Sequence, residues 1–355
     1  MSSVLDLARP DLRALDPYVP GAYEPGMIRL NANESPWRAP GDTTERGLNV
    51  YPPPRPFALR DRLAAHYGAP PEEILVTRGS SEAIDILIRG FCRAGQDDIL
   101  ICPPTFDMYR VYATIQAAGI VRVPLLRREG RFELDTPAVL DALGGRVKIV
   151  FLCTPNNPTG QSIPPADVEA VCAAASGRAL VVIDEAYHEF ASTNYLDLRR
   201  RYEHVVLLRT LSKFVSLAGV RCGAVVAARE VVEYLGNVLP PYTFPTPSIE
   251  LVLEALRDDS LRVSAERIAV IKRERERLAQ ALRDVPDVLE VYPSDANFIL
   301  VRTRDSALFR GAAHRAGILV RTFADPAVAD CVRITVGRPE DNDRLLEAVA
   351  RTERP

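Results

Sequence analysis

Between residues 57 and 227, short stretches of consecutive apolar residues alternate with segments whose apolar residues recur at helical spacing. The apolar stretches have the length of buried strands. They lie at 74–77, 98–102, 121–124, 148–153, 179–183, 205–208 and 225–227. Strands that are apolar on both sides and separated by helices are typical of a mostly parallel sheet covered by helices on both faces. The pattern therefore predicts an α/β fold.

The last third of the chain has a different pattern, which predicts a smaller α+β domain. Prolines near 240–247 precede a long, charged helical pattern at 248–283. Further strands are expected near 289–292, 298–301, 318–320 and 331–335, with helices at 306–316 and 341–351. We place the large domain at 46–238 and the small domain at 239–355. The first 45 residues are irregular and rich in Pro, Gly and Asn, so we expect an arm at 1–45 that packs with the small domain.

Composition excludes several classes of protein. The chain has 355 residues, and its 44 basic and 47 acidic residues give a net charge of −3, which is not the footprint of a nucleic-acid-binding protein. No apolar run reaches the roughly 20 residues that a membrane helix needs. The N-terminus has no signal-peptide pattern. Six scattered cysteines, without a C-x-x-C pair or a nearby His, predict a cytoplasmic protein with reduced thiols and no metal site.

Two polar loops follow predicted strands, where open α/β sheets bind ligands. Ser80 and Ser81 follow Gly79 at the start of a helix, so their free N–H groups could hold a phosphate. A plain turn with a serine cap is the structural alternative. Asn157 lies in the loop TPNNPTG, whose prolines and glycine predict a rigid turn with a possible cis X-Pro bond. That rigidity could aim an amide at a ligand, but by itself the loop fits a purely structural turn better.

An acid and a lysine follow the next two predicted strands. Asp184 ends a buried strand, and burial there is costly unless a cation or hydrogen-bond donors meet the carboxylate. Tyr187 follows three residues later. Only three lysines are present, Lys148, Lys213 and Lys272, and only Lys213 lies in a loop after a strand. A partly desolvated lysine has a lowered pKa and can form a Schiff base.

Several anion-binding side chains accompany this lysine. Ser212 and Arg221 could donate hydrogen bonds to a phosphate on the same side of the sheet. Arg333 lies within an expected strand, and Arg321 follows another. Either arginine could bind a substrate anion with both of its terminal nitrogens, although an ordinary paired surface residue is the more common case for each.

Taken together and in this order, the motifs resemble the fold-type I, class I/II aminotransferases that depend on pyridoxal 5'-phosphate (PLP). The resemblance is to the histidinol-phosphate aminotransferases in particular and covers nearly the whole chain. It is carried by LNANESP, NVYPPP, RGSSEAIDILIRGFC, CPPTFDMY, TPNNPTGQ, IDEAYHEF, LRTLSKFVSLAGVRCG and CVRITVG. It implies a large domain with a mostly parallel mixed sheet and a smaller α+β domain. It also implies a homodimer with shared active sites, in which the arm contacts the partner subunit.

The resemblance also implies roles for individual residues. Lys213 would hold PLP covalently and move the proton of the substrate Cα, while Asp184 would pair with the pyridine nitrogen. Asn157 and Tyr187 would bind the phenolic oxygen, and Tyr109 would lie on the ring face. The phosphate would be held by Ser80, Ser81, Ser212 and Arg221, and by Tyr51 across the dimer interface. The substrate would meet Tyr18, Asn33, Arg321 and Arg333.

The reaction implied is amino transfer from L-histidinol phosphate to 2-oxoglutarate, giving imidazole-acetol phosphate and L-glutamate, in histidine biosynthesis. Ser81 stands where an acidic residue is common in the family, and Phe106-Asp107 where Tyr-Gly is common, so the substrate is less fixed than the reaction type. An aromatic amino-acid aminotransferase is the main alternative. A threonine-phosphate decarboxylase and the effector domain of a PLP-sensing transcription regulator are more remote ones.

Overall fold

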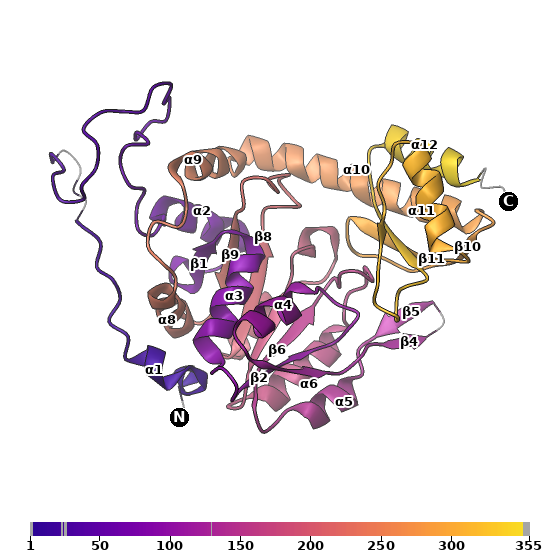
Figure 1. Cartoon of the computed structure of the whole chain (residues 1–355), viewed down its shortest axis with the longest axis horizontal. Coiled ribbons are helices and arrows are strands. Elements are labelled where there is room, and N and C mark those ends of the chain that lie inside the picture. Colours follow the sequence, from indigo (N-terminus) through magenta and orange to yellow (C-terminus); the bar gives the residue numbers. More distant parts are fainter. Residues whose placement is uncertain (1–2, 23, 25–26, 129, 351–355) are drawn as a thin grey trace.

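A seven-stranded sheet forms the centre of the protein (Figure 1). The structure is a computed structural model, and it describes residues 3–22, 24, 27–128 and 130–350. Its strand order is β1-β9-β8-β7-β6-β2-β3. From β8 to β3 every neighbouring pair is parallel, whereas β9 is antiparallel to both β1 and β8. The predicted α/β class and mostly parallel mixed sheet are therefore confirmed. The strands are β1 (Ile74–Thr77), β2 (Asp98–Ile101), β3 (Gly119–Arg122), β6 (Val147–Cys153), β7 (Leu180–Asp184), β8 (Val205–Thr210) and β9 (Gly223–Val226).

Helices cover both faces of this sheet and bury two separate apolar cores. The first core packs under α2 (Phe57–Tyr67), α5 (Thr136–Ala142), α6 (Pro165–Ala175), α7 (Leu196–Arg201) and α9 (Thr246–Ala255). The second packs under α3 (Gly79–Phe91), α4 (Met108–Ile115) and α8 (Arg229–Val238). Successive strand residues face opposite sides, so Ile183 belongs to the first core and Val182 to the second. By the same alternation, Asp184 faces the side of the second core, and Glu185 after it faces the first.

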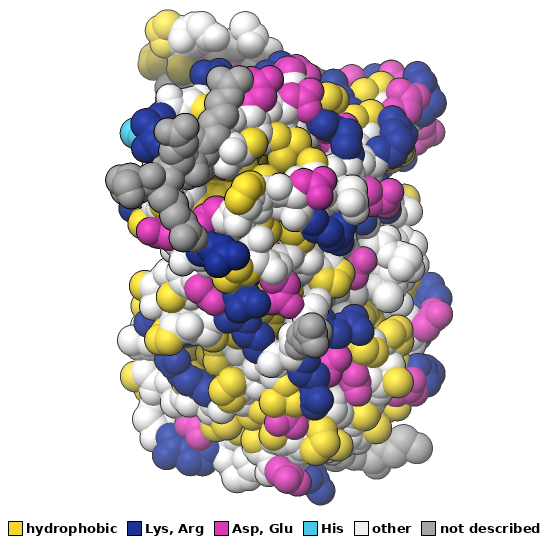
Figure 2. All heavy atoms as spheres, turned by 90° about the vertical axis from the view of Figure 1, so that its right-hand side faces the viewer, with side chains coloured by type: hydrophobic (Ala, Val, Ile, Leu, Met, Phe, Trp, Pro, Cys, Tyr) yellow, Lys and Arg dark blue, Asp and Glu magenta, His cyan; other side chains and the backbone are white. Residues whose placement is uncertain are grey.

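A second unit follows, built on a four-stranded antiparallel sheet with the order β10-β11-β13-β12. Its elements are α10 (Asp258–Arg283), β10 (Val288–Val291), β11 (Phe298–Thr303), α11 (Ser306–Arg315), β12 (Arg321–Thr322), β13 (Cys331–Thr335) and α12 (Pro339–Ala350). The hairpin of β4 (Leu126–Arg128) and β5 (Arg131–Glu133) reaches this unit from the large one. The rings of Phe132 and Tyr292 lie 5.1 Å apart there. Figure 2 shows the face of the molecule that lies on the right-hand side of Figure 1, and on it basic and acidic side chains are interspersed with one another.

Two expectations for the C-terminal third need correction. The helical pattern at 248–283 is two helices, α9 and α10, separated at Leu256 and Arg257. Val252 and Leu256 pack in the first core of the large unit, whereas the core of the small unit contains Leu278 and Leu282 of α10, with Ile271 packed against it. The junction between the units therefore lies along α10 and not at residue 239. The strand expected at 318–320 begins instead at Arg321.

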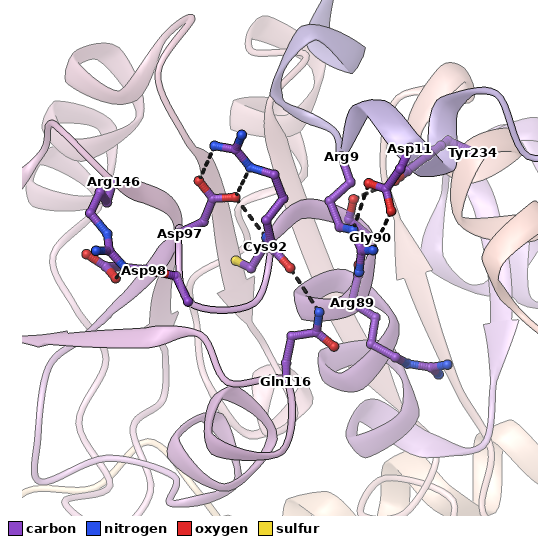
Figure 3. A network of polar contacts seen from close by, with 12 residues as sticks. Arg9, Asp11, Arg89, Gly90, Cys92, Asp97, Asp98, Gln116, Arg146 and Tyr234 are labelled. Atoms are coloured by element: carbon purple, nitrogen blue, oxygen red, sulfur yellow. Dashed lines mark hydrogen bonds and ion pairs between the residues drawn. The ribbon is translucent and has the colours of Figure 1, made fainter.

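The N-terminal segment also departs from expectation, since residues 3–13 pack on the large unit and not on the small one. Val4 and Leu7, in the 3-10 turn Val4–Leu7, lie in the second core. The short helix α1 covers Pro10–Arg13, and Arg9 is its N-cap. Figure 3 shows Arg9 at the end of α3, where its backbone N–H donates to the carbonyl of Gly90 over 3.0 Å. The hydroxyl of Tyr234 donates to the same carbonyl. These bonds satisfy a carbonyl that the helix end leaves without an intrahelical partner.

Residues after α1 leave the body of the molecule as an extended segment before the chain returns at α2 (Figure 1). Large apolar side chains are exposed along it: Tyr18, Val19, Met27, Ile28, Leu30, Trp37, Leu48 and Tyr51. Exposed apolar surface on this scale is a mark of an interaction site. Among the described residues, no helix is both long and apolar enough to cross a membrane.

Candidate active site

A cavity of about 300 Å³ opens at the carboxyl ends of β6, β7 and β8, beside the start of α3 and close to β13. This is the position at which open α/β sheets bind ligands. It is lined by Ser80, Ser81, Phe106, Cys153, Asn157, Asp184, Ala186, Tyr187, Thr210, Ser212, Lys213, Ala218, Arg221 and Arg333. The structure thus brings together most of the residues that the sequence analysis singled out, from segments more than 250 positions apart.

Asp184 lies at the base of this cavity as a buried carboxylate, only 2% exposed. Its Oδ2 accepts a hydrogen bond from the hydroxyl of Tyr109 over 2.7 Å, and its Oδ1 accepts one from the N–H of Ala186 over 3.2 Å. Burial raises the pKa of Asp184 to about 6, although both hydrogen bonds oppose the rise. A carboxylate in this state gains from a cationic partner in the cavity, such as a protonated ring nitrogen.

Lys213 reaches the same cavity from the turn after β8. Its Nζ lies 5.8 Å from the centre of the Tyr187 ring. Burial is the main cause that lowers the pKa of Lys213, and the positive charges of Arg333 and Arg221 add to it. A lowered pKa increases the fraction of neutral amine, which is the nucleophilic form.

A cradle for an anion lies at the start of α3. Gly79 has a φ of +75°, and a Cβ there would lie 2.8 Å from Nη2 of Arg221. The guanidinium therefore occupies space that a side chain would fill. Nη1 of Arg221 donates to Ser212 Oγ over 3.3 Å, and Thr210 Oγ1 lies 3.0 Å from the same oxygen. Hydroxyls, an arginine and the start of a helix are the donors that bind phosphate groups.

The small unit supplies Arg333, which joins this cavity to a larger chamber of about 690 Å³. Nη1 of Arg333 donates to Oδ1 of Asn157, so the amide N–H groups of Asn157 remain to donate elsewhere. Arg321 lines the chamber and pairs with Arg333 in the register of β12 and β13. The chamber is lined by Pro104, Thr105, Phe106, Asp107, Met108, Asn157, Pro158, Arg321, Phe323, Ala324, Asp325, Val328 and Arg333. Two cations beside aromatic rings suit an anionic substrate that carries a ring.

The predicted place of Tyr109 differs from the one observed. Its side chain is fully buried, and its ring stacks on Phe151 with 4.5 Å between centroids. It does not line the cavity, whereas Phe106, three residues earlier and before the start of α4, does. The ring of Phe106 meets that of Tyr109 edge-on, 5.7 Å away. Phe106 is therefore the aromatic side chain that can face a bound ring, and Tyr109 contacts Asp184 from behind.

Three predicted residues lie in the N-terminal segment, outside both cavities. Tyr18 is 70% exposed, and Asn33 is exposed as well, with a φ of +55°. Tyr51 is half exposed, and its ring stacks on Tyr242 at 4.7 Å. In the structure, these side chains do not meet the other candidate residues.

The loop TPNNPTG has the cis bonds that its sequence suggested, at Thr154-Pro155 and Asn157-Pro158. Sequence reasoning did not name Phe298, although its ring lies 5.3 Å from that of Tyr187 and 5.3 Å below the guanidinium of Arg333. Nothing in the sequence near Phe298 pointed to the site, because this residue begins β11 in the other unit and lies in no polar loop after a strand. The sequence did point to Thr210, which also lines the cavity, because this residue precedes the Ser-x-Lys motif by two positions.

The arrangement combines a lysine of lowered pKa, a buried acid, an anion cradle and a second anion site. A family model described as aminotransferase class I and II matches residues 29–349. A histidinol-phosphate aminotransferase from Xylella fastidiosa is 44% identical over 349 residues, which cover 97% of this chain and 95% of the relative. Histidinol-phosphate aminotransferase from Sinorhizobium meliloti, solved in complex with pyridoxal-5'-phosphate, has a TM-score of 0.77 at 24% identity over 86% of this chain and 83% of that one. N-succinyldiaminopimelate aminotransferase from Mycobacterium tuberculosis has a TM-score of 0.75 at 25% identity over 87% of each chain. This chain therefore belongs to the class I and II aminotransferase family.

Proposed function

We propose that this protein transfers the amino group of L-histidinol phosphate to 2-oxoglutarate, giving imidazole-acetol phosphate and L-glutamate, with PLP as its cofactor. The observation that carries the proposal is the convergence of Lys213, Asp184 and the Arg221 cradle in one cavity. Each offers what one part of PLP needs: an amine for the aldehyde, a carboxylate for the pyridinium and donors for the phosphate. The residues present therefore fit this cofactor.

The residues around the cofactor would have distinct tasks. PLP, when bound, supplies an electron sink for the negative charge left on the substrate Cα. Asp184 would keep the pyridine nitrogen protonated, because a buried carboxylate favours a cation beside it. Lys213 would carry the proton between the substrate Cα and C4′ of the cofactor. Asn157 and Tyr187 would donate hydrogen bonds to the phenolic oxygen, and the ring of Phe106, which lines the same cavity, would offer apolar contact to the cofactor ring.

The charge of the chamber supports the choice of substrates. Histidinol phosphate is an amine with a phosphate and an imidazole ring, and 2-oxoglutarate carries two carboxylates. Arg333, assisted by Arg321, can bind the anion of each in turn. Phe106 and Phe323 offer apolar contact to a ring. The same lining would suit phenylalanine, so an aromatic aminotransferase is the second candidate.

We further propose that the protein is a homodimer, supported by the apolar side chains exposed along the N-terminal segment. Tyr51 would then reach the partner's phosphate cradle, and Tyr18 and Asn33 would cover the partner's substrate chamber. We also propose a cytoplasmic location, which is supported by the six cysteines, all described, buried and present as free thiols.

The test is to purify the protein with PLP, reduce it with borohydride and map the labelled peptide. Label on Lys213, together with a change in the visible spectrum on adding histidinol phosphate, is expected. Turnover is then compared for histidinol phosphate, phenylalanine and threonine phosphate. A catalytic efficiency more than about tenfold higher for phenylalanine would overturn the substrate, and release of CO₂ from threonine phosphate would indicate a lyase. Label elsewhere would overturn the whole proposal.

A further inference from the structure

A buried polar cluster lies on the opposite side of β7 and β8 from Asp184. Its centre is the ion pair of Arg209 with Glu185, whose side chains are 3% and 0% exposed. Nε and Nη2 of Arg209 lie 2.8 Å and 2.7 Å from Oε2 of Glu185. Nη2 also donates to Oδ1 of Asn194 over 3.2 Å, and the guanidinium lies 5.5 Å from the centre of the Tyr67 ring. The tasks proposed above for the active site do not use this cluster.

The remaining nitrogen of Arg209 contacts His188. Nη1 donates to Nε2 of the imidazole, and because a guanidinium has only donors, Nε2 must be the acceptor nitrogen. The ring proton is then on Nδ1, which lies 3.0 Å from a carboxylate oxygen of Glu189. Arg209 therefore holds two residues at once, Glu185 and His188, by side-chain contacts from one strand.

These two residues are the ends of a tight turn. The N–H of His188 donates to the carbonyl of Glu185 over 3.1 Å, and the N–H of Glu185 donates to Leu208 on β8 over 3.0 Å. Between the two ends lie Ala186 and Tyr187, and both line the cofactor cavity. The N–H of Ala186 is one of the two donors to Asp184. The turn thus presents two cavity residues and a donor to Asp184 on one side while Arg209 holds its ends on the other.

We propose that Arg209 is a positioning residue for the reaction, which fixes the turn Glu185–His188 from behind so that Tyr187 and the Ala186 N–H keep their places around the cofactor. This rests on the proposed function only in that PLP occupies the cavity, and not on the identity of the substrate. A guanidinium suits the task because its planar fork binds two partners in fixed directions, which a lysine ammonium cannot do.

The test separates position from stability, because a broken buried ion pair destabilises a protein whatever its role. Arg209→Met leaves the charge of Glu185 buried without its partner. The double variant Glu185→Leu with Arg209→Met removes both charges, a replacement that often restores stability. The control is Arg199→Met, which breaks another ion pair away from the cavity, that of buried Arg199 with partly buried Glu73 at 2.6 Å. Each variant is measured for apoprotein melting temperature, for PLP dissociation constant and for kcat.

We expect Arg209→Met to lower the melting temperature, to weaken PLP binding about tenfold and to lower kcat about a hundredfold, the scale for a displacement of ~1 Å at a reacting centre. The double variant should regain the melting temperature but not the PLP affinity or kcat. Arg199→Met should lose only stability. If the double variant regains both PLP affinity and kcat to within about twofold of wild type, Arg209 acts on stability alone and the proposal is wrong. Absent turnover of histidinol phosphate by the wild type would instead contradict the proposed function, and would leave the PLP affinities to decide the role of Arg209.

Discussion

The hydroxyl of Tyr109 donates a hydrogen bond of 2.7 Å to Oδ2 of Asp184, and both side chains are buried. The tyrosine cannot move away easily, because its ring is stacked on Phe151 and meets Phe106 edge-on. Burial raises the pKa of Asp184, and this hydrogen bond to its charged form opposes the rise. Tyr109 therefore favours the anionic form of Asp184, which is the form that the proposed function requires.

Replacing Tyr109 by Phe should weaken catalysis without removing the cofactor. A hydrogen bond to a charged group contributes about 1.5–3 kcal/mol, so kcat should fall by about tenfold or more. The pKa of Asp184 should rise further, which moves the acid limb of the kcat/KM profile to higher pH. The control is Tyr234→Phe, which removes a buried hydroxyl that donates to the Gly90 carbonyl, far from the cavity. An unchanged pH profile in Tyr109→Phe would contradict this role.

Asp184 should make the apoprotein less stable as the pH rises. Its folded pKa, about 6, is above the ordinary value of 3.8, so the folded state binds the proton more tightly than the unfolded state. The stability that this proton provides is fully present below pH 3.8 and is lost as the pH rises through about 6. The loss is about 3 kcal/mol, at 1.36 kcal/mol per pKa unit. Asp184→Asn should abolish this part of the pH dependence of the unfolding free energy.

The control for that experiment has the opposite sign. The pKa of buried Asp97 is lowered, chiefly by its hydrogen bond with Arg93 (the ion pair beside Asp97 is drawn in Figure 3). Its stabilising effect is therefore present above pH 3.8 and lost below it. Asp97→Asn should destabilise the apoprotein at neutral pH, where Asp184→Asn stabilises it. Equal effects of the two substitutions at pH 7 would refute the assignment for Asp184.

Gly79→Ala should weaken PLP binding by displacing Arg221. The new Cβ would lie 2.8 Å from Nη2 and 3.3 Å from Cζ of this arginine, so the guanidinium must shift from its place in the anion cradle. Gly95→Ala is a matched control, since Gly95 has a similar φ of +70° but nothing within 4 Å of its Cβ position. Both variants should lose similar backbone stability. Only Gly79→Ala should raise the PLP dissociation constant, and a rise in both would assign the effect to strain.

Arg333→Ala should raise KM for histidinol phosphate and for 2-oxoglutarate together, because one guanidinium is expected to bind the anion of each. Arg333→Lys keeps the charge but loses the planar fork, so it should recover part of the loss at most. Initial rates at several concentrations of each substrate measure both constants. A rise in only one KM would mean that the two substrates use different anion sites.

Much of the fold could be predicted because its strands are apolar and short. The expected strands at 74–77 and 331–335 and the helix at 57–67 have the observed bounds. The sequence could not locate the junction between the units correctly, because Val252 and Leu256 are equally apolar whether they pack on the large unit or on the small one. Only the tertiary contacts distinguish the two cases.

The sequence by itself determined the α/β fold of the class I and II aminotransferases. It also identified the polar residues that follow β6, β7 and β8, since a polar residue after a buried apolar strand can be recognised from the sequence. Tertiary structure alone decided which aromatic of CPPTFDMY faces the cavity, because Phe106 precedes α4 whereas Tyr109 lies in its first turn, so no helical period relates the two side chains. It also decided that Arg209 holds both ends of the turn after Asp184. Such contacts depend on how neighbouring strands are aligned and on which side of the sheet each side chain faces. The local sequence of one strand does not determine which side chains of another strand it will meet.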